Sequence, residues 1–280
     1  MDFKEIKFET EGSVAIITFN RPEVMNCIGP TTHEELVQAW QEFKTNDQLK
    51  VAVITGAGEK AFCAGGDLKA AFNGQLIDFS PENIKAHRAG AVDGILGPSR
   101  WTDIYKPIIA AVNGVAYAGG LEWACFADMR IAATNASFGV TCRRWNIGLA
   151  DGGTQRLPRI VGMGRAMELI ITGKVIDAEE AYRIGLANEV VPEGQALKRA
   201  LELAHFIAEL PQPAILSDKE AAYRGFGESL DEGLKIEANK FLDSIVSPDT
   251  QKGLEQFNKR LHPDRQYDQV PKTPGIVRGK

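Results

Sequence analysis

Hydrophobic residues fall along this chain in short runs that predict β-strands. Residues 6–9 and 15–19 alternate apolar and polar side chains on either side of Glu11-Gly12, a pattern typical of a β-hairpin. Residues 51–55 and 108–112 are continuous apolar runs, which indicate buried strands. The chain is therefore expected to open with a hairpin and to continue with strands inside a packed core.

Helical patterns separate these runs. Residues 32–44 have helical spacing, and Thr31 or Thr32 is expected as the N-cap because Glu34 and Glu35 would lie in the first turn. A second helix-forming run covers residues 121–129. The repeated order of strand and then helix predicts an α/β fold.

The C-terminal part of the chain is expected to be mostly helical. Asp177 is predicted to cap a helix through a D-x-x-E capping box with Glu180, and Gly185 to end that helix. Helical patterning then continues from residue 195 to about residue 261. We predict a core over residues 1–200, a helical region over 201–261 and a loosely ordered, proline-containing and charged tail over 262–280.

Composition narrows the class of protein. A chain of 280 residues with 44% hydrophobic side chains is long enough to bury about three quarters of its unfolded surface in one core. The net charge of -5 argues against a nucleic-acid binder, which usually carries a basic stripe. The charged start of the chain contains no signal peptide, and no apolar run is long enough for a membrane span. A cytoplasmic protein is the expectation.

Cysteine and histidine are sparse. The four cysteines (Cys27, Cys63, Cys125 and Cys142) are too few for a disulfide scaffold and have no metal-ligand spacing. The four histidines are scattered along the chain and form no metal motif either. We therefore expect no metal site.

The candidate chemistry begins in KPIIAAVNGVAYAGGLE, residues 106–122. Gly119 and Gly120 follow a predicted strand, and glycine lets a backbone N–H approach a ligand atom closely because no Cβ intervenes. Glu122 would lie in the first turn of the helix that follows. An oxyanion donor and a general acid or base would thus lie within one turn of each other, as polarising a carbonyl and moving a proton require.

A second segment, KAFCAGGDLK over residues 60–69, follows the buried strand 51–55. Its Ala64-Gly65-Gly66 again places exposed amides after a strand, and Asp67 is positioned to open the next helix.

These two segments resemble the paired signatures of the crotonase family, also called the enoyl-CoA hydratase/isomerase superfamily. DGGTQRLPRIVGMGRAMELIITG (151–173) and DAEEAYRIGLANEVVP (177–192) agree with the family in order and spacing. The resemblance covers about residues 3–260 and implies a spiral of ββα units followed by C-terminal helices. It also implies an acyl-CoA thioester substrate, trimers commonly paired as hexamers, and no cofactor apart from the coenzyme A of the substrate.

The same resemblance implies roles for individual residues. The backbone amides of Gly66 and Gly119 would form the oxyanion hole. Glu122 matches one of two catalytic glutamates of the hydratases, which helps to activate the water that adds to the β-carbon. A carboxylate buried beside a thioester is expected to have a raised pKa.

One position departs from the family pattern. In SFGVTCRRWNIGLADGG, Cys142 stands where the hydratases carry their second catalytic glutamate. Three explanations are open: Asp151 replaces the lost acid, Glu122 alone takes the water proton and returns it to the α-carbon, or the chemistry has changed. Cys142 itself is interpreted as a small buried hydrophobe, because neither a histidine nor a helix start stands beside it in the sequence to lower its thiol pKa.

Coenzyme A binding rests on dispersed positions that the resemblance places around the adenine and the pantetheine. The residues are Val24, Met25, Asn26, Ala64, Asp67 and Leu68, with Phe257 and Arg260 reaching toward CoA from near the C-terminus. Residues 70–105, which have weak helical patterning, match the region that lines the acyl pocket in this family.

The predicted function is therefore hydration of a 2-enoyl-CoA thioester through an oxyanion-stabilised enolate. Isomerisation, thioester hydrolysis and decarboxylation share the fold and the enolate and are the alternatives within the enzyme class. A CoA-binding protein without catalysis is the alternative outside it, and the retention of Glu122 with both glycine donors argues against that class.

Overall fold

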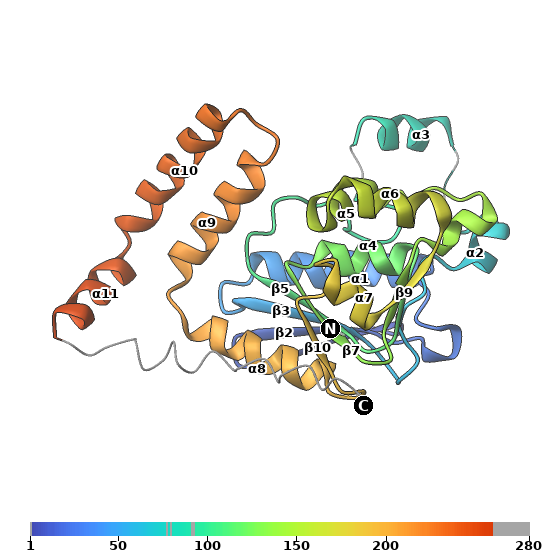
Figure 1. The fold of residues 1–280 in the computed structure, drawn as a ribbon, viewed down its shortest axis with the longest axis horizontal. Helices are drawn as coiled ribbons and strands as arrows, with labels where there is room; N and C mark the ends of the chain where they lie inside the picture. Colours follow the sequence, from blue (N-terminus) through green and yellow to red (C-terminus); the bar gives the residue numbers. More distant parts are fainter. Residues whose placement is uncertain (1, 77, 79, 91–92, 260–280) are drawn as a thin grey trace.

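Two β-sheets organise the part of the chain that the structure describes (Figure 1). This computed structural model describes residues 2–76, 78, 80–90 and 93–259. The larger sheet has the strand order β1-β2-β3-β5-β7-β10 and the smaller sheet the order β4-β6-β8-β9. Pairing is antiparallel for β1 with β2 and for β8 with β9, and parallel elsewhere. The strands are β1 (Ile6–Glu11), β2 (Val14–Phe19), β3 (Val51–Gly56), β4 (Ala61–Cys63), β5 (Ile108–Val112), β6 (Val115–Tyr117), β7 (Met129–Ala133), β8 (Ser137–Gly139), β9 (Val175–Asp177) and β10 (Glu189–Val191).

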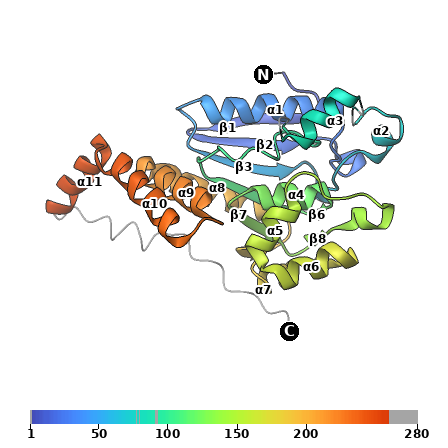
Figure 2. The same cartoon turned by 90° about the horizontal axis from the view of Figure 1, so that it is seen from above.

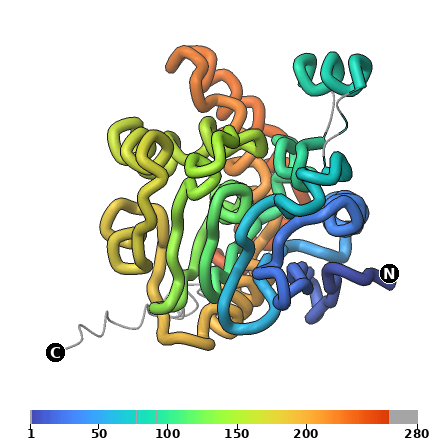
Figure 3. The backbone as a smooth tube through the Cα atoms, turned by 90° about the vertical axis from the view of Figure 1, so that its right-hand side faces the viewer, coloured from blue at the N-terminus to red at the C-terminus, as the bar shows by residue number. Residues whose placement is uncertain are grey.

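The chain winds between the sheets in repeated strand–strand–helix units. The first unit is β3, β4 and α2 (Leu68–Phe72), the second is β5, β6 and α4 (Gly119–Phe126), and the third is β7 and β8 followed by α5 (Gly153–Val161). Each unit adds its first strand to the larger sheet and its second strand to the smaller one. Figure 3 shows the backbone of successive units lying side by side. The predicted α/β spiral of ββα units is confirmed.

Helices cover both faces of the larger sheet (Figure 1). On one face lie α1 (Pro30–Thr45) and α4, and the rings of Trp40 and Trp123 stack with centroids 5.8 Å apart. On the other face lies α8 (Ala196–Glu209), which buries alanines at positions 196, 200, 204 and 208 against the strands. A stripe of alanines at a spacing of four lets this helix approach the sheet closely.

The strand predictions agree with the structure. Residues 6–11 and 14–19 form the hairpin of β1 and β2, and β5 has the predicted bounds Ile108–Val112. The strand predicted over residues 51–55 is β3 and is one residue longer. Every position of β2, β3 and β5 is buried. Because buried positions carry mostly apolar side chains, these strands appear in the sequence as apolar runs.

Two helix boundaries differ from the predictions. The N-cap of α1 is Gly29, so the prediction of Thr31 or Thr32 is wrong. Pro30 takes the first helical position, where its fixed φ is favourable and its missing N–H costs nothing. The helix predicted over residues 121–129 is α4, which begins at Gly119 and ends at Phe126. Pairing with β5 takes the following residues into β7, since Met129 is in register with Ile109.

Asp177 caps α7 (Ala178–Arg183) as predicted, whereas the Glu180 carboxylate binds the Arg183 guanidinium instead of completing the predicted capping box. The Asp177 carboxylate accepts a hydrogen bond from the Glu180 amide at 2.8 Å, and Gly185 follows the helix with φ +80°. The other short elements are α3 (Pro81–Arg88), α6 (Met163–Thr172) and the 3₁₀ turns η1 (Pro22–Val24) and η2 (Thr141–Trp145).

Helical structure continues from α8 to residue 258, as predicted. The last three helices, α9 (Gln212–Gly225), α10 (Leu230–Ile245) and α11 (Pro248–Asn258), extend away from the sheets (Figures 1 and 2). The predicted boundary between residues 200 and 201 lies within α8, and α8 packs on the larger sheet. The helices that leave the body therefore begin at Gln212. The tail predicted over residues 262–280 lies outside the described residues.

Candidate active site

Three adjacent strands of the smaller sheet end at the predicted site. Parallel pairing of β4 with β6 and of β6 with β8 brings their carboxyl ends to one edge. Gly65 and Gly66 follow β4, Gly119 follows β6, and Cys142 follows β8. A Cβ added to Gly65 would lie 3.0 Å from the Gly119 nitrogen, so the two glycine segments are in direct contact. The spiral thus assembles residues that are far apart in the sequence.

The amides of Gly66 and Gly119 are both available as donors. Ile28 donates to the Gly65 carbonyl and accepts from the Asp67 amide, each at 2.9 Å. Since neighbouring amides of an extended backbone point in opposite directions, the Gly66 N–H points away from Ile28. Gly119 is the first residue of α4, where the amide has no partner within the helix. Among the described residues, neither amide donates a hydrogen bond. Both amides are therefore free to donate to a ligand.

Close packing explains the glycines before Glu122. A Cβ on Gly120 would lie 1.8 Å from the Cys63 carbonyl oxygen, and one on Gly119 would lie 2.1 Å from Leu96 Cδ1. Ala118, directly before them, has φ +50° and ψ -117°. A positive φ is strained for a residue with a Cβ, and such strain is often found at functional sites. The turn between β6 and α4 is thus held in a conformation that the local sequence disfavours.

Glu122 lies in the first turn of α4 as predicted, and its side chain is almost completely buried. Only 2% of the residue is exposed. Oε1 accepts hydrogen bonds from the amides of Asp151 and Gly153, both at 2.8 Å. Gly153 is the first residue of α5, so the carboxylate lies at a helix N-terminus, where the dipole favours negative charge. These contacts fix the orientation of the carboxyl group.

Burial raises the pKa of Glu122 to about 7, and the charge of Asp151 contributes to the increase. The amides of Gly153, Asp151 and Ala150 act in the opposite direction, because they stabilise the ionised form. A carboxyl group with a pKa near 7 can both take and return a proton near neutral pH.

Asp151 is buried beside Glu122 and holds a distant segment of the chain. Its Oδ1 accepts hydrogen bonds from the Ile95 amide at 2.9 Å, the Leu96 amide at 3.0 Å and the Ser99 hydroxyl at 2.5 Å. Asp151 does not cap α5, whose N-cap is Gly152. The carboxylate therefore ties residues 95–99 to the loop that binds Glu122.

The segment held by Asp151 reaches both glycines of the predicted oxyanion hole. Leu96 Cδ2 would lie 3.2 Å from a Cβ on Gly66, and the Leu96 carbonyl accepts from Trp123 Nε1 at 2.9 Å. Leu96 and Ser99 could not be identified as part of the site from the sequence. Their contacts span 27 to 55 residues, and no local pattern signals pairing over that separation.

Cys142 lies at the start of η2 and is buried. Burial raises the pKa of its thiol, the charge of Arg143 lowers it and the charge of Glu122 raises it. The thiol therefore stays protonated near neutral pH, which fits the interpretation of a small buried hydrophobe. Arg143 donates to the carbonyls of Ile170 and Ile147, both at 2.9 Å, and so braces the turn that holds Cys142.

Comparison with known proteins agrees with this geometry. The sequence model that describes enoyl-CoA hydratase/isomerase proteins matches residues 9–268. The chain belongs to the enoyl-CoA hydratase/isomerase family. The short-chain-enoyl-CoA hydratase of Clostridium acetobutylicum is 36% identical over 260 residues, which cover 92% of this chain and 95% of that protein. The crotonyl-CoA hydratase of Syntrophomonas wolfei is 37% identical over 260 residues, covering 92% and 96%. A crystal structure of enoyl-CoA hydratase from Bacillus anthracis has a TM-score of 0.81 at 35% identity, covering 92% of this chain and 97% of that one.

The segments that family resemblance assigns to coenzyme A lie together in the structure. The Ala64 amide donates to the Met25 carbonyl at 3.0 Å. Asn26 is buried and donates through Nδ2 to the carbonyls of Ala57 and Ala61 at 3.0 and 2.8 Å. Asp67 caps α2, beside the exposed Leu68. Val24 ends η1 directly before Met25. These contacts place residues 24–26 against residues 64–68, beside the Gly66 amide.

The C-terminal residues assigned to coenzyme A are placed differently. Phe257 is exposed on α11, which lies at the opposite side of the molecule from α2 (Figure 1). Phe257 therefore does not join residues 24–26 within one chain. Arg260 lies outside the described residues.

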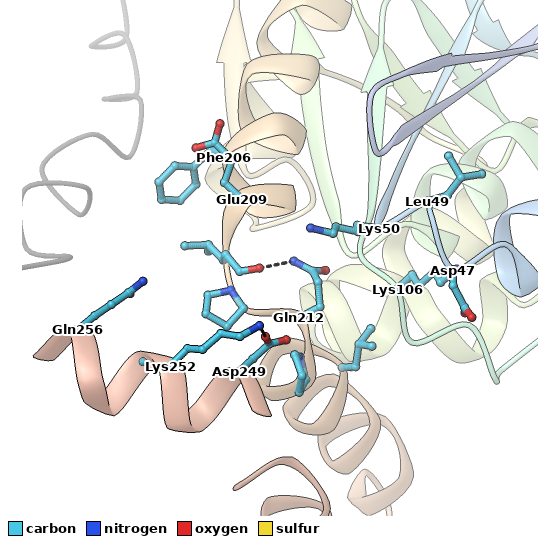
Figure 4. Close-up of a pocket in the computed structure, with 15 residues that line it drawn as sticks. Asp47, Leu49, Lys50, Lys106, Phe206, Glu209, Gln212, Asp249, Lys252 and Gln256 are labelled. Atoms are coloured by element: carbon cyan, nitrogen blue, oxygen red, sulfur yellow. Dashed lines mark hydrogen bonds and ion pairs between the residues drawn. The ribbon is translucent and has the colours of Figure 1, made fainter. Parts of the chain in front are cut away.

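A cavity of about 810 Å³ lies between α11 and the junction of α8 and α9 (Figure 4). Lys50 donates to the Ala208 carbonyl at 2.9 Å, and Gln212 donates to the Leu210 carbonyl at 2.7 Å. In the part of the chain described, the predicted catalytic and CoA-binding residues are not in its lining. This cavity is thus separate from the site.

Two absences apply to residues 2–76, 78, 80–90 and 93–259. In these ranges, no three His, Cys, Asp or Glu side chains gather where they could hold a metal ion. Within the same ranges, no helix combines the length and apolar character that crossing a membrane requires.

Proposed function

We propose that this member of the enoyl-CoA hydratase/isomerase family adds water to a 2-enoyl-CoA thioester. One observation carries the proposal: a buried carboxyl group, Glu122, with a pKa of about 7, lies beside two glycine segments in which the amides of Gly66 and Gly119 have no protein partner among the described residues. The names of the two relatives and of the similar crystal structure support the same reaction.

In the proposed mechanism, the amides of Gly66 and Gly119 donate to the thioester oxygen. As a water oxygen bonds to the β-carbon, Glu122 takes one proton from that water and the thioester becomes an enolate. The enolate then re-forms the carbonyl as the α-carbon takes a proton, which Glu122 returns. Each oxyanion donor is worth about 3 kcal/mol of transition-state stabilisation in comparable sites.

The proposal assigns the proton transfers to Glu122 alone and gives Asp151 a positioning role. Oδ1 of Asp151 already accepts three hydrogen bonds from the segment 95–99. The negative charge of Asp151 also helps to raise the pKa of Glu122. In the alternative, Asp151 replaces the acid that is missing at Cys142.

For substrate binding, we propose that Val24, Met25, Asn26, Ala64, Asp67 and Leu68 surround coenzyme A, which enters as part of the substrate. Their contact with one another beside Gly66 supports this. Because Phe257 lies far from these residues in its own chain, we propose that Phe257 and Arg260 serve a neighbouring subunit of a homotrimer or hexamer. A cytoplasmic location is supported by four cysteines that are all free thiols.

The test is turnover of short and medium 2-enoyl-CoA thioesters, followed by loss of the conjugated enoyl absorbance. Glu122→Gln keeps the shape and the acceptor oxygen but cannot exchange a proton, so the rate is expected to fall by about 10²- to 10⁴-fold. Glu179→Gln is the matched control, because Glu179 is an exposed first-turn glutamate of α7. Wild-type turnover in Glu122→Gln would remove Glu122 from the mechanism. Absence of hydration in the wild type would contradict the proposed function.

A further inference from the structure

A second cavity of about 890 Å³ lies one helical turn from Glu122. It is enclosed by the C-terminal end of α4, the loop 149–152, α5, α9 and residues 100–105. Glu122, Cys125 and Phe126 occupy positions i, i+3 and i+4 of α4 and so share one face of that helix. Cys125 and Phe126 line the cavity.

The loop 149–152 forms the wall between the cavity and Glu122. Ala150 and Gly152 line the cavity, while the amides of Asp151 and Gly153 hold the Glu122 carboxylate from the other side. Leu149 also lines the cavity, and its Cδ1 would lie 3.0 Å from a Cβ added to Gly153. A group that extends from the β-carbon past this loop would therefore reach the cavity.

The lining is strongly basic in a protein whose net charge is -5. Among the described lining residues, one carboxylate, Asp128, faces six cationic side chains. Lys219 pairs with Asp128 at 2.7 Å, and Arg224 pairs with Glu220 at 2.8 Å. The other four cations are Arg100, Arg130, Arg156 and Arg159.

These four arginines form no ion pair with the described residues, and their side chains donate hydrogen bonds to neutral groups such as backbone carbonyls. Burial lowers the pKa of both Arg130 and Arg156, and the charges of nearby carboxylates (Asp128 for Arg130, Glu122 and Asp151 for Arg156) offset only part of that decrease. Buried charges of one sign are costly unless an opposite charge joins them. The cavity therefore favours an anion.

Two of these side chains have donors free to receive that anion. Arg100 donates through Nε to the Ala150 carbonyl at 2.7 Å, and its two terminal nitrogens donate to no described residue. Arg159 donates through Nη1 to the Gln155 carbonyl at 2.6 Å and stacks over the Phe226 ring at 5.0 Å. A guanidinium fork matches a carboxylate in shape and charge. The aromatic walls of Trp101 and Phe126 suit the carbon chain that would carry it.

We propose that this cavity binds a carboxylate at the far end of the substrate's acyl group, so that the preferred 2-enoyl-CoA is one whose chain ends in a carboxylate. This inference rests on the proposed function. Residues 100–105 of the cavity lining belong to the region that family resemblance assigns to the acyl pocket, and the residues assigned to coenzyme A, 24–26 and 64–68, do not line the cavity within the described part of the chain. The anion is thus assigned to the acyl end rather than to a phosphate of coenzyme A.

The experiment compares two eight-carbon 2-enoyl-CoA thioesters, one ending in a carboxylate and one in a methyl group. The wild-type protein is expected to favour the carboxylate-ended thioester by at least about tenfold in kcat/KM, the range of one charge-assisted contact. Arg100→Gln should lower kcat/KM at least about tenfold more for the carboxylate-ended thioester than for the methyl-ended one. Arg100→Gln also removes the hydrogen bond from Arg100 to the Ala150 carbonyl, which holds the loop 149–152. Arg159→Gln tests the contact with the carboxylate without that loss, because Arg159 is exposed and holds no loop.

Arg165→Gln is the matched control, because Arg165 is an exposed arginine on α6 outside the cavity. It should leave the preference unchanged. A wild-type protein without preference, or an equal loss for both thioesters in Arg100→Gln and Arg159→Gln, would overturn the inference, since the anion would then lie elsewhere.

A second measurement separates this inference from the proposed function. The saturated eight-carbon thioesters cannot be hydrated, so calorimetry reports their binding without turnover. Tighter binding of the carboxylate-ended thioester that depends on Arg100 would support the cavity even if no hydration occurs. Hydration of both unsaturated thioesters at equal efficiency would support the proposed function and exclude the cavity as a subsite.

Discussion

At the scale of single residues, opposing effects act on the ionisation of Glu122. Two amides at the start of α5 stabilise its carboxylate, while burial and the charge of Asp151 disfavour it and raise the pKa to about 7 from the ordinary 4.5. Between pH 4.5 and 7 the folded protein keeps a proton that the unfolded chain releases, so this group makes the protein less stable as the pH rises.

Glu122→Gln removes that pH dependence, because the amide does not titrate and its oxygen still accepts both hydrogen bonds. The variant should gain about 3 kcal/mol of unfolding free energy relative to the wild type between pH 4 and pH 8. Urea unfolding of both proteins across this range measures the difference. A difference that stays constant with pH would show that Glu122 does not have a raised pKa.

Asp151 can be tested as a positioning residue against the role of a second acid. If it positions residues 95–99, Asp151→Asn and Ser99→Ala should each reduce kcat/KM by about tenfold or less, and their effects should not add, because both act on one hydrogen-bonded unit. If it is the second acid, Asp151→Asn should cost about 10²- to 10⁴-fold and Ser99→Ala little.

The pH profile separates the two roles further. Asp151→Asn removes the negative charge that helps to raise the pKa of Glu122, so the acid limb of kcat/KM should move to lower pH. Ser99→Ala keeps that charge and should leave the limb in place. A limb that stays fixed in Asp151→Asn would contradict the electrostatic coupling of these two carboxylates.

At the scale of elements, the start of α4 depends on the contact between Gly120 and β4. A Cβ on Gly120 would lie 1.8 Å from the Cys63 carbonyl oxygen, and backbone must move to relieve the clash. We expect Gly120→Ala to lower the free energy of unfolding by at least about 2 kcal/mol. Gly164, also the second residue of a helix, has open space around it, so Gly164→Ala should stabilise by about 0.5 kcal/mol. Equal effects in thermal unfolding would show that the contact with β4 is relaxed.

The elements that the sequence predicts well are those with local signals. β2, β3 and β5 are buried at every position, and Asp177 caps α7 through a residue three positions away. The end of α4 was misplaced because pairing of Met129 with Ile109 outweighs a helix-forming run. Family resemblance identified Glu122 and the glycines, whereas the contact of Asp151 with Ser99 joins residues 52 positions apart. Only the folded spiral brings that pair together.

At the scale of the whole molecule, α10 carries an apolar stripe that no described residue covers. Leu230, Leu234, Phe241 and Ile245 recur at helical spacing and are 40 to 78% exposed. The contact of α10 with α9 uses other residues. The Lys240 carbonyl, for example, accepts a hydrogen bond from the Ser217 hydroxyl. Exposed apolar patches of this kind are typical of interfaces. The stripe thus fits the proposed trimer or hexamer.

Charge on this stripe should dissociate the assembly. Phe241→Asp is expected to shift the sedimentation coefficient toward that of a monomer, because a carboxylate would be buried in the interface. Asn239→Asp adds the same charge on another face of α10 and should leave the assembly intact. A wild-type protein that sediments as a monomer would contradict the proposed assembly.

Dissociation also tests whether Phe257 acts across subunits. Because α11 lies far from the site of its own chain, Phe257 can contact coenzyme A only in a neighbour. Phe257→Ala should therefore raise KM for acyl-CoA in the assembled protein. In the dissociated Phe241→Asp variant, KM should already be raised because the neighbouring subunit is lost, so adding Phe257→Ala should not raise it further. Independent, additive effects of the two substitutions on KM would show that Phe257 acts within its own subunit or not on coenzyme A at all.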